Sequence, residues 1–221
     1  MTAERLVLVR HGVTDWNRAG RFQGHLDPPL AADGRTEAQL LGARLRGLPD
    51  DERPTRVIAS SLARALETGR IIAETLGITA TPDARLMEIG QGEWEGRSHA
   101  ELEQEDADRY AAWRADHDAR PPGAEDLDLA GERSLAAIAD ALEGDGIPCV
   151  VTHGGILRLL AIHLLELPTI GWDLDADNCS LSVISLAGDG PWQLERWNDV
   201  NHLLGVVTTH VDEEDGHPLA L

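Results

Sequence analysis

The sequence predicts an α/β fold with a mostly parallel central sheet. Three short apolar segments are typical of buried strands: residues 6–9, 56–59 and 148–152. Helical patterns follow the second and third segments, and this alternation favours parallel strands joined by helices. At 221 residues the chain suits one domain with an ample core.

The remaining elements follow from hydrophobic periodicity. Helices are predicted at residues 31–48, 62–76, 99–105, 107–117, 132–142 and 156–165. A strand is expected at 78–81, and the segments 179–186 and 192–197 form a hairpin that closes the sheet. Asp33 is expected to cap the first helix and Ser60 or Ser61 the second, and Gly77 is expected to end the second in a left-handed conformation. Residues 14–30 are expected to form a loop over the sheet edge.

Charge restricts the possible partners. The net charge is −20, which argues against nucleic acid or an anionic membrane because both would be repelled. The N-terminus is charged, and the apolar segment 156–165 is far short of the roughly 20 residues of a membrane span. We therefore expect a cytoplasmic protein that holds any anionic substrate by local contacts.

The basic residues and the cysteines exclude several kinds of catalysis. All 19 basic residues are arginine, so Schiff-base chemistry, pyridoxal attachment and a P-loop lysine are excluded. Cys149 and Cys179 lie in apolar strand-like runs and are expected to be buried reduced thiols rather than a disulfide. Neither begins a Cys-x5-Arg loop, which argues against a cysteine-based phosphatase.

Basic side chains follow three predicted strands. Arg10 and His11 follow the first, Arg64 lies just beyond the second, and His153 follows the strand at 148–152. Each alone is more often a structural or solvated group. Together they would meet at one sheet edge, where ligands of open α/β sheets bind, and guanidinium groups match phosphoryl oxygens in pairs. The pattern predicts a phosphoryl-binding site.

Four motifs resemble the histidine phosphatase superfamily, phosphoglycerate mutase-like branch. They are Arg10-His11-Gly12, SSLARALETG around Arg64, LMEIGQGEWEG around Glu88 and VTHGG around His153, and the resemblance covers about residues 5–205 in family order. It implies a three-layer α/β/α sandwich as a single domain at 1–210, with a variable lid insertion at 97–130. Residues 211–221 are expected to be a mobile acidic tail.

The resemblance also implies roles for individual residues. His11 would be the nucleophile, its far ring nitrogen bonded to a backbone carbonyl in the Gly12 turn, and Arg10, Arg64 and His153 would stabilise charge on the phosphoryl oxygens. The pattern alone does not choose among Glu88, Glu93 and Glu95; the resemblance selects Glu88 as general acid and base. The implied phosphate-binding residues are Thr14, Asn17, Gln23, Gly24 and Gly154. Neither a metal nor a cofactor is expected.

The resemblance implies a phosphorylated small metabolite as substrate, so the expected activity is that of a phosphomonoesterase. The lysine-free chain has a short acidic insertion, which favours hydrolysis over a 2,3-bisphosphoglycerate-dependent phosphoglycerate mutase. The stretches GRSHAEL and AAWRAD are similar to phosphatases of sugar phosphates or glucosyl-3-phosphoglycerate, a more specific alternative. A metallohydrolase and a non-catalytic phosphate-binding module are the alternatives from other classes. The first lacks a close ligand pair such as His-Glu-x-x-His.

Further expectations concern the insertion at 97–130 and the strand at 179–186. GAEDLDLAGER stands where many family members read Gly-Gly-Glu-Ser, so the resemblance does not predict the roof of the pocket. Tyr110, Trp113 and Arg114 have helical spacing that favours core or surface roles over substrate contact. An apolar exposed edge strand at 179–186 would allow a homodimer.

Overall fold

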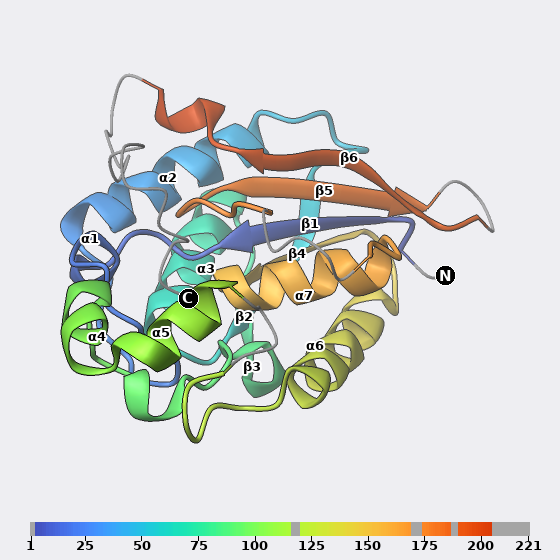
Figure 1. Ribbon diagram of the computed structural model, residues 1–221. Helices are drawn as coiled ribbons and strands as arrows, with labels where there is room; N and C mark the ends of the chain where they lie inside the picture. The colour runs from blue at the N-terminus through green and yellow to red at the C-terminus, as the bar shows by residue number, and fades with distance from the viewer. Residues whose placement is uncertain (1–2, 116–119, 169–173, 187–189, 205–221) are drawn as a thin grey trace.

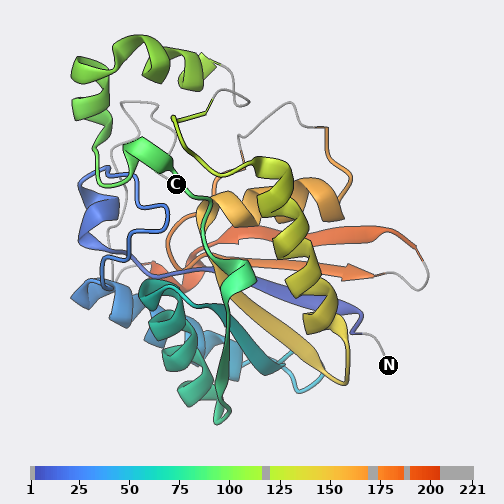
Figure 2. The ribbon, with the colours of Figure 1, turned by 90° about the horizontal axis from the view of Figure 1, so that it is seen from below.

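The computed structural model describes residues 3–115, 120–168, 174–186 and 190–204, which form a sheet covered by helices on both faces (Figures 1 and 2). Within these residues six strands pair in the order β3-β2-β4-β1-β5-β6. Their bounds are β1 Arg5–Arg10, β2 Pro54–Ser60, β3 Ala80–Asp83, β4 Ile147–Thr152, β5 Leu181–Leu186 and β6 Trp192–Asp199. The β1–β4, β2–β4 and β2–β3 pairs are parallel, whereas β1–β5 and β5–β6 are antiparallel. The predicted α/β fold with a mostly parallel sheet is confirmed.

Two predicted strands were misplaced. β3 begins at Ala80 instead of residue 78, because its parallel register with β2 runs from Val57–Ala80 to Ser60–Asp83. β5 begins at Leu181, since Cys179 is left-handed at φ 53°. The expectation of an exposed edge strand at 179–186 was wrong, because β5 pairs with β1 on one side and β6 on the other. The edge-strand argument for a homodimer therefore fails.

The helices form the two outer layers. Their bounds are α1 Asp15–Arg18, α2 Ala32–Arg46, α3 Ala63–Leu76, α4 His99–Glu105, α5 Ala107–Ala115, α6 Leu127–Leu142 and α7 Gly154–Leu164, with 3-10 turns at Ala84–Leu86, Gly92–Trp94 and Asn201–Leu203. Figure 2 shows α6 and α7 on one face of the sheet and α2 and α3 on the other. None of these helices is long and apolar enough to cross a membrane.

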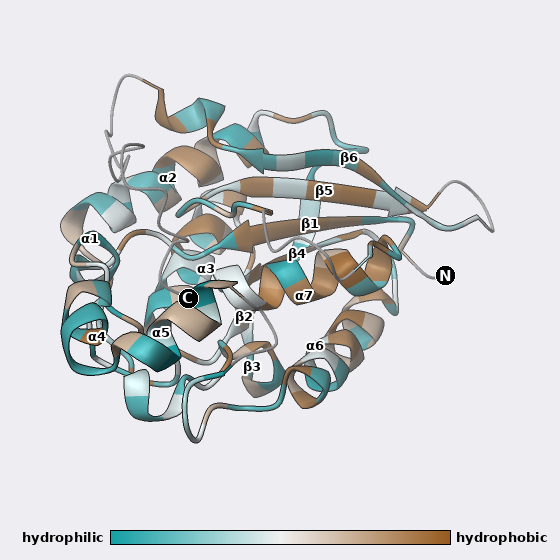
Figure 3. Cartoon of the chain, viewed as in Figure 1, coloured by the Kyte–Doolittle hydropathy of each residue, from teal (hydrophilic) through white to brown (hydrophobic). Residues whose placement is uncertain are grey.

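Alternation along β1 builds both halves of the core. Leu6 and Leu8 pack into the cluster formed with α6 and α7, whereas Val7 and Val9 pack into the cluster formed with α2 and α3. The hydrophobic residues concentrate on β1, β5 and α7 in Figure 3, where α4 is largely hydrophilic. The core sits on both faces of β1 and β4 and leaves their carboxyl ends free for polar residues.

Some helix starts differ from the sequence expectations, whereas α4 agrees with the prediction at both ends and α3 and α6 end where predicted. α6 begins five residues before the predicted position, because the Asp126 side chain accepts from the backbone N–H groups of Asp128 and Leu129. The N-caps of α2 and α3 are Ala31 and Leu62, without a side-chain bond, so the predicted Asp33 and serine caps were wrong. The short α1, capped by Thr14, lies in the predicted loop 14–30. Gly77 ends α3 at φ 76°, as predicted.

Helices α4 and α5 lie together beyond one end of the sheet (Figure 2). A cluster of mostly aromatic side chains anchors them there. Phe22, Trp94, Leu102 and Tyr110 are buried together, and Trp113 packs against them. The expected core role of Tyr110 and Trp113 is confirmed, and Arg114 forms a surface ion pair with Glu103 at 3.8 Å. Residues 116–119 of the predicted lid and the whole acidic tail lie outside the described residues.

Both cysteines are buried free thiols, as predicted. Burial alone raises the pKa of Cys149 to about 12. Such a thiol is inert at neutral pH, which agrees with the absence of a cysteine nucleophile motif.

Candidate active site

The carboxyl ends of three parallel strands lie side by side in the sheet. Arg10 at the end of β1 pairs with Thr152 at the end of β4, and Ala59 of β2 is in register with Val151 of β4. The His11 N–H donates to Thr152 O at 2.9 Å and extends this ladder by one residue. The residues that follow these strands therefore project from one edge.

His11 is a buried imidazole with a defined tautomer. Its Nδ1 lies 2.7 Å from Gly12 O, and a carbonyl only accepts, so Nδ1 carries the proton and Nε2 keeps its lone pair. Burial, reinforced by the charges of Arg64 and Arg10, holds the pKa of His11 well below its usual value. The predicted carbonyl bond in the Gly12 turn is confirmed, and the ring is a neutral nucleophile candidate.

Glycine is required beside His11 because helix α2 approaches the turn closely. A Cβ at Gly12 would lie 2.5 Å from Gly34 O, which no side chain tolerates without a backbone shift. The Gly12 N–H donates to Thr68 Oγ1 at 3.1 Å, and this hydroxyl in turn donates to Arg64 O. The turn that holds His11 is thus tied to the helix that carries Arg64.

Arg10 and Arg64 are buried guanidinium groups near His11. Arg10 Nη1 donates to Ala176 O at 2.6 Å, while Arg64 Nη1 and Nη2 donate to Leu26 O and Gly24 O. Burial lowers the pKa of Arg64 to about 10, so the group stays charged at neutral pH, and burial also lowers the pKa of Arg10. The Nε atoms of both arginines are buried without a hydrogen-bond partner in the described part of the chain.

His153 faces His11 from the end of β4. The two rings make an edge contact with centroids 5.1 Å apart. His153 Nε2 shares a hydrogen bond with Ser60 Oγ at 2.8 Å, whereas its buried Nδ1 has no partner among the described residues. Burial, with the charge of Arg64 next, holds the pKa of His153 well below its usual value. His153 is also the N-cap of α7, so Gly154 lies in the helix turn whose free N–H groups favour anions.

The geometry distinguishes Glu88 from the two other carboxylates left open by the sequence. Glu88 is buried, and its Oε1 and Oε2 accept from Ile89 N at 2.9 Å and Gly155 N at 3.3 Å. The Glu88 carboxyl group interacts electrostatically with Arg10 and Arg64, which places it in the same cluster. Glu93 is exposed, and Glu95 Oε1 accepts from the backbone of the surrounding loops instead.

The loop after β1 brings three predicted residues into one network. Thr14 Oγ1 accepts from Asn17 N and lies 2.9 Å from Asn17 Oδ1 and 3.2 Å from Gln23 Oε1. Gly24, left-handed at φ 49°, contributes its carbonyl to Arg64. In this structure Thr14 caps α1 and Gly24 O holds Arg64, so both have structural contacts in addition to the expected ligand role.

Sequence patterns did not mark two residues that support His11. Asn178 Nδ2 donates to His11 O at 3.0 Å, and Glu37 Oε2 accepts from Val13 N at 2.8 Å. Glu37 is fully buried, and its position on the predicted helix 31–48 was the available signal, because a carboxylate on an apolar helix face is rare. No local signal marks Asn178, which only precedes an apolar run.

Two charged guanidinium groups, two neutral imidazoles and one buried carboxyl group therefore share one site. Guanidinium nitrogens and the α7 N-terminus suit the oxygens of a phosphoryl group. In the residues that the structure describes, no group of three or more His, Cys, Asp or Glu side chains is arranged to hold a metal ion. The arrangement can bind a phosphoryl group and present Nε2 of a neutral imidazole to it.

Known proteins are similar to this chain in sequence and in fold. The family model of the histidine phosphatase superfamily (branch 1) matches residues 6–200. A glucosyl-3-phosphoglycerate phosphatase of Mycobacterium tuberculosis is 32% identical, covering 90% of this chain and 96% of the relative. A probable phosphoglycerate mutase GpmB of Salmonella paratyphi C is 36% identical, covering 90% of this chain and 94% of the relative. The solved structure of a mycobacterial glucosyl-3-phosphoglycerate phosphatase in complex with VO3 has a TM-score of 0.77 at 33% identity, covering 89% of this chain and 99% of that one.

Proposed function

Because this chain belongs to the histidine phosphatase superfamily (branch 1), we propose that it hydrolyses phosphomonoesters of small metabolites through a phosphohistidine on His11, without a metal. The family makes the chain a phosphatase. One observation supports His11 as the nucleophile: its Nδ1–H is committed to Gly12 O, so Nε2 of a neutral ring is available for attack.

The first step transfers the phosphoryl group to the enzyme. The Nε2 lone pair of His11 attacks phosphorus, the P–O ester bond breaks, and its electron pair leaves on the alkoxide oxygen. Glu88 starts as the carboxylic acid and gives its proton to that oxygen. The Nε atoms of Arg10 and Arg64 and the Nδ1 of His153 are buried and have no hydrogen-bond partner among the described residues, so they suit the equatorial oxygens in the transition state.

The second step returns the enzyme to its starting state. The Glu88 carboxylate takes a proton from water, and the oxygen of that water attacks phosphorus. The N–P bond breaks and its electron pair returns to His11 Nε2, which leaves inorganic phosphate and a protonated Glu88. The same carboxyl group thus serves as acid and then as base.

All the candidate substrates are phosphomonoesters of small metabolites. The relative named glucosyl-3-phosphoglycerate phosphatase supports a phosphorylated sugar or sugar acid as the more specific candidate. The relative named a probable phosphoglycerate mutase keeps phosphoryl transfer between hydroxyl groups as the alternative. The absence of lysine and the short acidic insertion favour hydrolysis over mutase activity. A non-catalytic module is disfavoured because all five reactive side chains are present and clustered.

Release of inorganic phosphate tests the proposal. The panel contains an aryl phosphate, 3-phosphoglycerate, sugar phosphates and glucosyl-3-phosphoglycerate, all with chelator, and it compares wild type with His11→Ala. The exposed His163 on α7 gives the matched control His163→Ala. Activity that survives chelator, vanishes in His11→Ala and persists in His163→Ala supports the proposal. Folded wild type that releases no phosphate, but interconverts phosphoglycerates once 2,3-bisphosphoglycerate is added, is a mutase instead.

A further inference from the structure

The segment that carries Glu88 is irregular, and side chains elsewhere in the fold hold its backbone. Residues 87–91 belong to no helix or strand, so their carbonyls lack the partners of regular structure. The four consecutive carbonyls of residues 85–88, which run from the 3-10 turn Ala84–Leu86 into this segment, nevertheless all accept hydrogen bonds from side chains. Thr152 Oγ1 donates to Leu86 O at 2.7 Å, and Arg133 of α6 supplies the other three.

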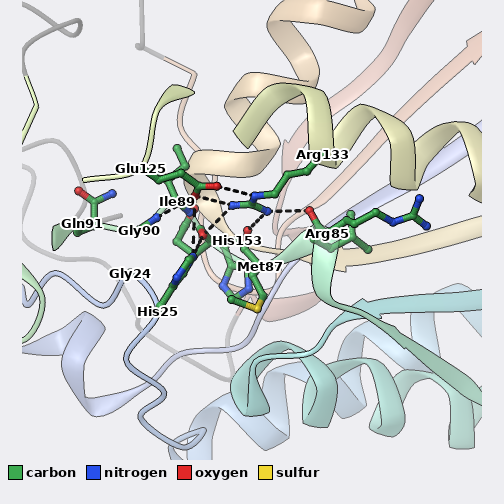
Figure 4. A network of polar contacts seen from close by, with 12 residues as sticks. Gly24, His25, Arg85, Met87, Ile89, Gly90, Gln91, Glu125, Arg133 and His153 are labelled. Atoms are coloured by element: carbon green, nitrogen blue, oxygen red, sulfur yellow. Dashed lines mark hydrogen bonds and ion pairs between the residues drawn. The ribbon is translucent and has the colours of Figure 1, made fainter. Parts of the chain in front are cut away.

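Arg133 uses its whole guanidinium group for this purpose (Figure 4). Nη1 donates to Arg85 O at 2.7 Å and to Met87 O at 2.6 Å, and Nη2 donates to Glu88 O at 3.0 Å. Nε and the second N–H of Nη2 donate to the two carboxylate oxygens of Glu125, each at 2.8 Å. All five N–H donors of the planar fork are occupied, which no lysine could reproduce.

Glu125 connects this arrangement to the insertion at 97–130. Its Oε2 also accepts from Gly90 N at 3.1 Å, and its backbone N–H donates to Gly90 O at 2.8 Å. Arg120 Nη1 donates to Glu125 O at 2.6 Å. Both ends of the Glu88 segment are therefore fixed, one by Arg133 directly and the other through Glu125.

A second side chain, that of His25 in the loop after β1, reaches Glu88 O. His25 Nε2 lies 2.7 Å from this carbonyl, and Figure 4 shows His25 approaching from the side opposite Arg133. Glu88 O thus accepts from two side chains, while the Glu88 carboxyl group lies against the start of α7. Small rotations of this backbone would move the carboxyl group relative to His11.

We infer that Arg133, oriented by Glu125, is a positioning residue that fixes Glu88 for proton transfer to the leaving group. The inference rests on the proposed function, because it assumes that Glu88 is the acid. Arg133 and Glu125 set the geometry of the acid, and Glu125 couples the base of the insertion to the reacting centre. Proton transfer depends steeply on such geometry.

Leaving-group dependence tests the inference, because protonation matters for a poor leaving group and little for a good one. The assay compares kcat/KM for an alkyl phosphate with kcat/KM for 4-nitrophenyl phosphate, since this parameter reports transfer to His11 for both. Arg133→Lys and Glu125→Gln are expected to lose at least tenfold more activity on the alkyl substrate than on the aryl one. Glu88→Gln provides the benchmark for complete loss of the acid.

The matched control is Arg85→Met. Arg85 lies on the same segment, but its side chain pairs with Asp83 and Asp140 at the surface. The ratio of kcat/KM on the alkyl substrate to kcat/KM on the aryl substrate should therefore stay at the wild-type value in this variant. In the double variant Arg133→Lys/Glu88→Gln, the alkyl loss should not exceed that of Glu88→Gln alone. Thermal unfolding shows which variants are folded; if Arg133→Lys is not, Glu125→Gln decides the question.

Two kinds of failure are distinguishable. Equal losses on both substrates in folded Arg133→Lys and Glu125→Gln, or additive loss in the double variant, would overturn the inference and leave the proposed function intact. An unchanged ratio in Glu88→Gln would instead remove Glu88 as the acid, and the positioning role of Arg133 with it.

Discussion

The buried carboxyl group of Glu37 gives a quantitative prediction about stability. Glu37 lies behind the His11 turn, where its Oε2 accepts from Val13 N and its Oε1 has no partner among the described residues. Burial raises the pKa of Glu37 from the ordinary 4.5 to about 7; the Val13 N–H and the charges of Arg18 and Arg10 oppose this rise, whereas Asp33 favours it. The folded protein therefore keeps a proton that the unfolded chain loses between these two pH values.

Proton linkage sets the direction in which the stability changes with pH. Over this range the unfolded state binds fewer protons, so the stability that Glu37 contributes is complete below pH 4.5 and is lost as the pH rises to about 7. At about 1.36 kcal/mol per pH unit, the loss totals about 3 kcal/mol. Glu37→Gln removes the titrating group and keeps an acceptor for Val13 N. The variant should gain about 3 kcal/mol relative to wild type between pH 4.5 and pH 8.

Urea unfolding of wild type and Glu37→Gln across this pH range measures the difference between their free energies of unfolding. The contributions of the other titrating groups cancel in that difference. Glu101→Gln is the control. The Ser98 N–H and Arg21 lower the pKa of Glu101 below 4.5, so its titration is almost complete before this range begins, and the stability difference between that variant and wild type should stay nearly constant from pH 4.5 to pH 8. A wild-type-to-Glu37→Gln difference that stays constant with pH would refute the reasoning about Glu37.

The remaining predictions concern Gly155 and Asp126. A Cβ at Gly155 would lie 2.7 Å from Glu88 Oε1, so Gly155→Ala should cost about 1–3 kcal/mol of stability and lower kcat/KM for alkyl phosphates at least tenfold; Gly47→Ala, whose Cβ meets nothing closer than 3.4 Å, should do neither. Urea unfolding and phosphate release check both, and wild-type behaviour of Gly155→Ala would contradict the close contact. Asp126→Ala should lose about 1 kcal/mol with the α6 N-cap, whereas Asp126→Ser should restore most of it; equal stability of the two variants would contradict the cap.

Strand ends were the most predictable part of the site. A strand's apolar run and the glycine after it are local signals, so Arg10-His11-Gly12 and His153 could be placed at one sheet edge before the register was known. The register then brings Arg10 beside Thr152, and the rings of His11 and His153 meet at 5.1 Å. Hydrophobic periodicity shows where a buried strand runs and therefore where it ends. This accounts for the agreement between the predicted and observed positions of the residues at the strand ends.

Contacts made across the fold could not be predicted. Arg133 was expected only as part of the helix 132–142, because nothing near it in the sequence reveals that it reaches the carbonyls of residues 85, 87 and 88. At the departure from Gly-Gly-Glu-Ser, Asp126 caps α6 and the Glu125 carboxylate pairs with Arg133. The cap depends on the exact helix start, and the ion pair joins residues that lie apart in the sequence, so the sequence pattern did not reveal these contacts.

The most direct test of the account is to trap the phosphorylated enzyme. Acid-free rapid quench of wild type with an aryl phosphate, followed by mass spectrometry of the peptides, should find an acid-labile phosphoryl group on His11. Glu88→Gln should accumulate more of it, because the group that activates water is gone while an aryl leaving group needs no proton. A phosphoryl group on another residue, or rapid turnover of His11→Ala with the same substrate, would contradict the central claim.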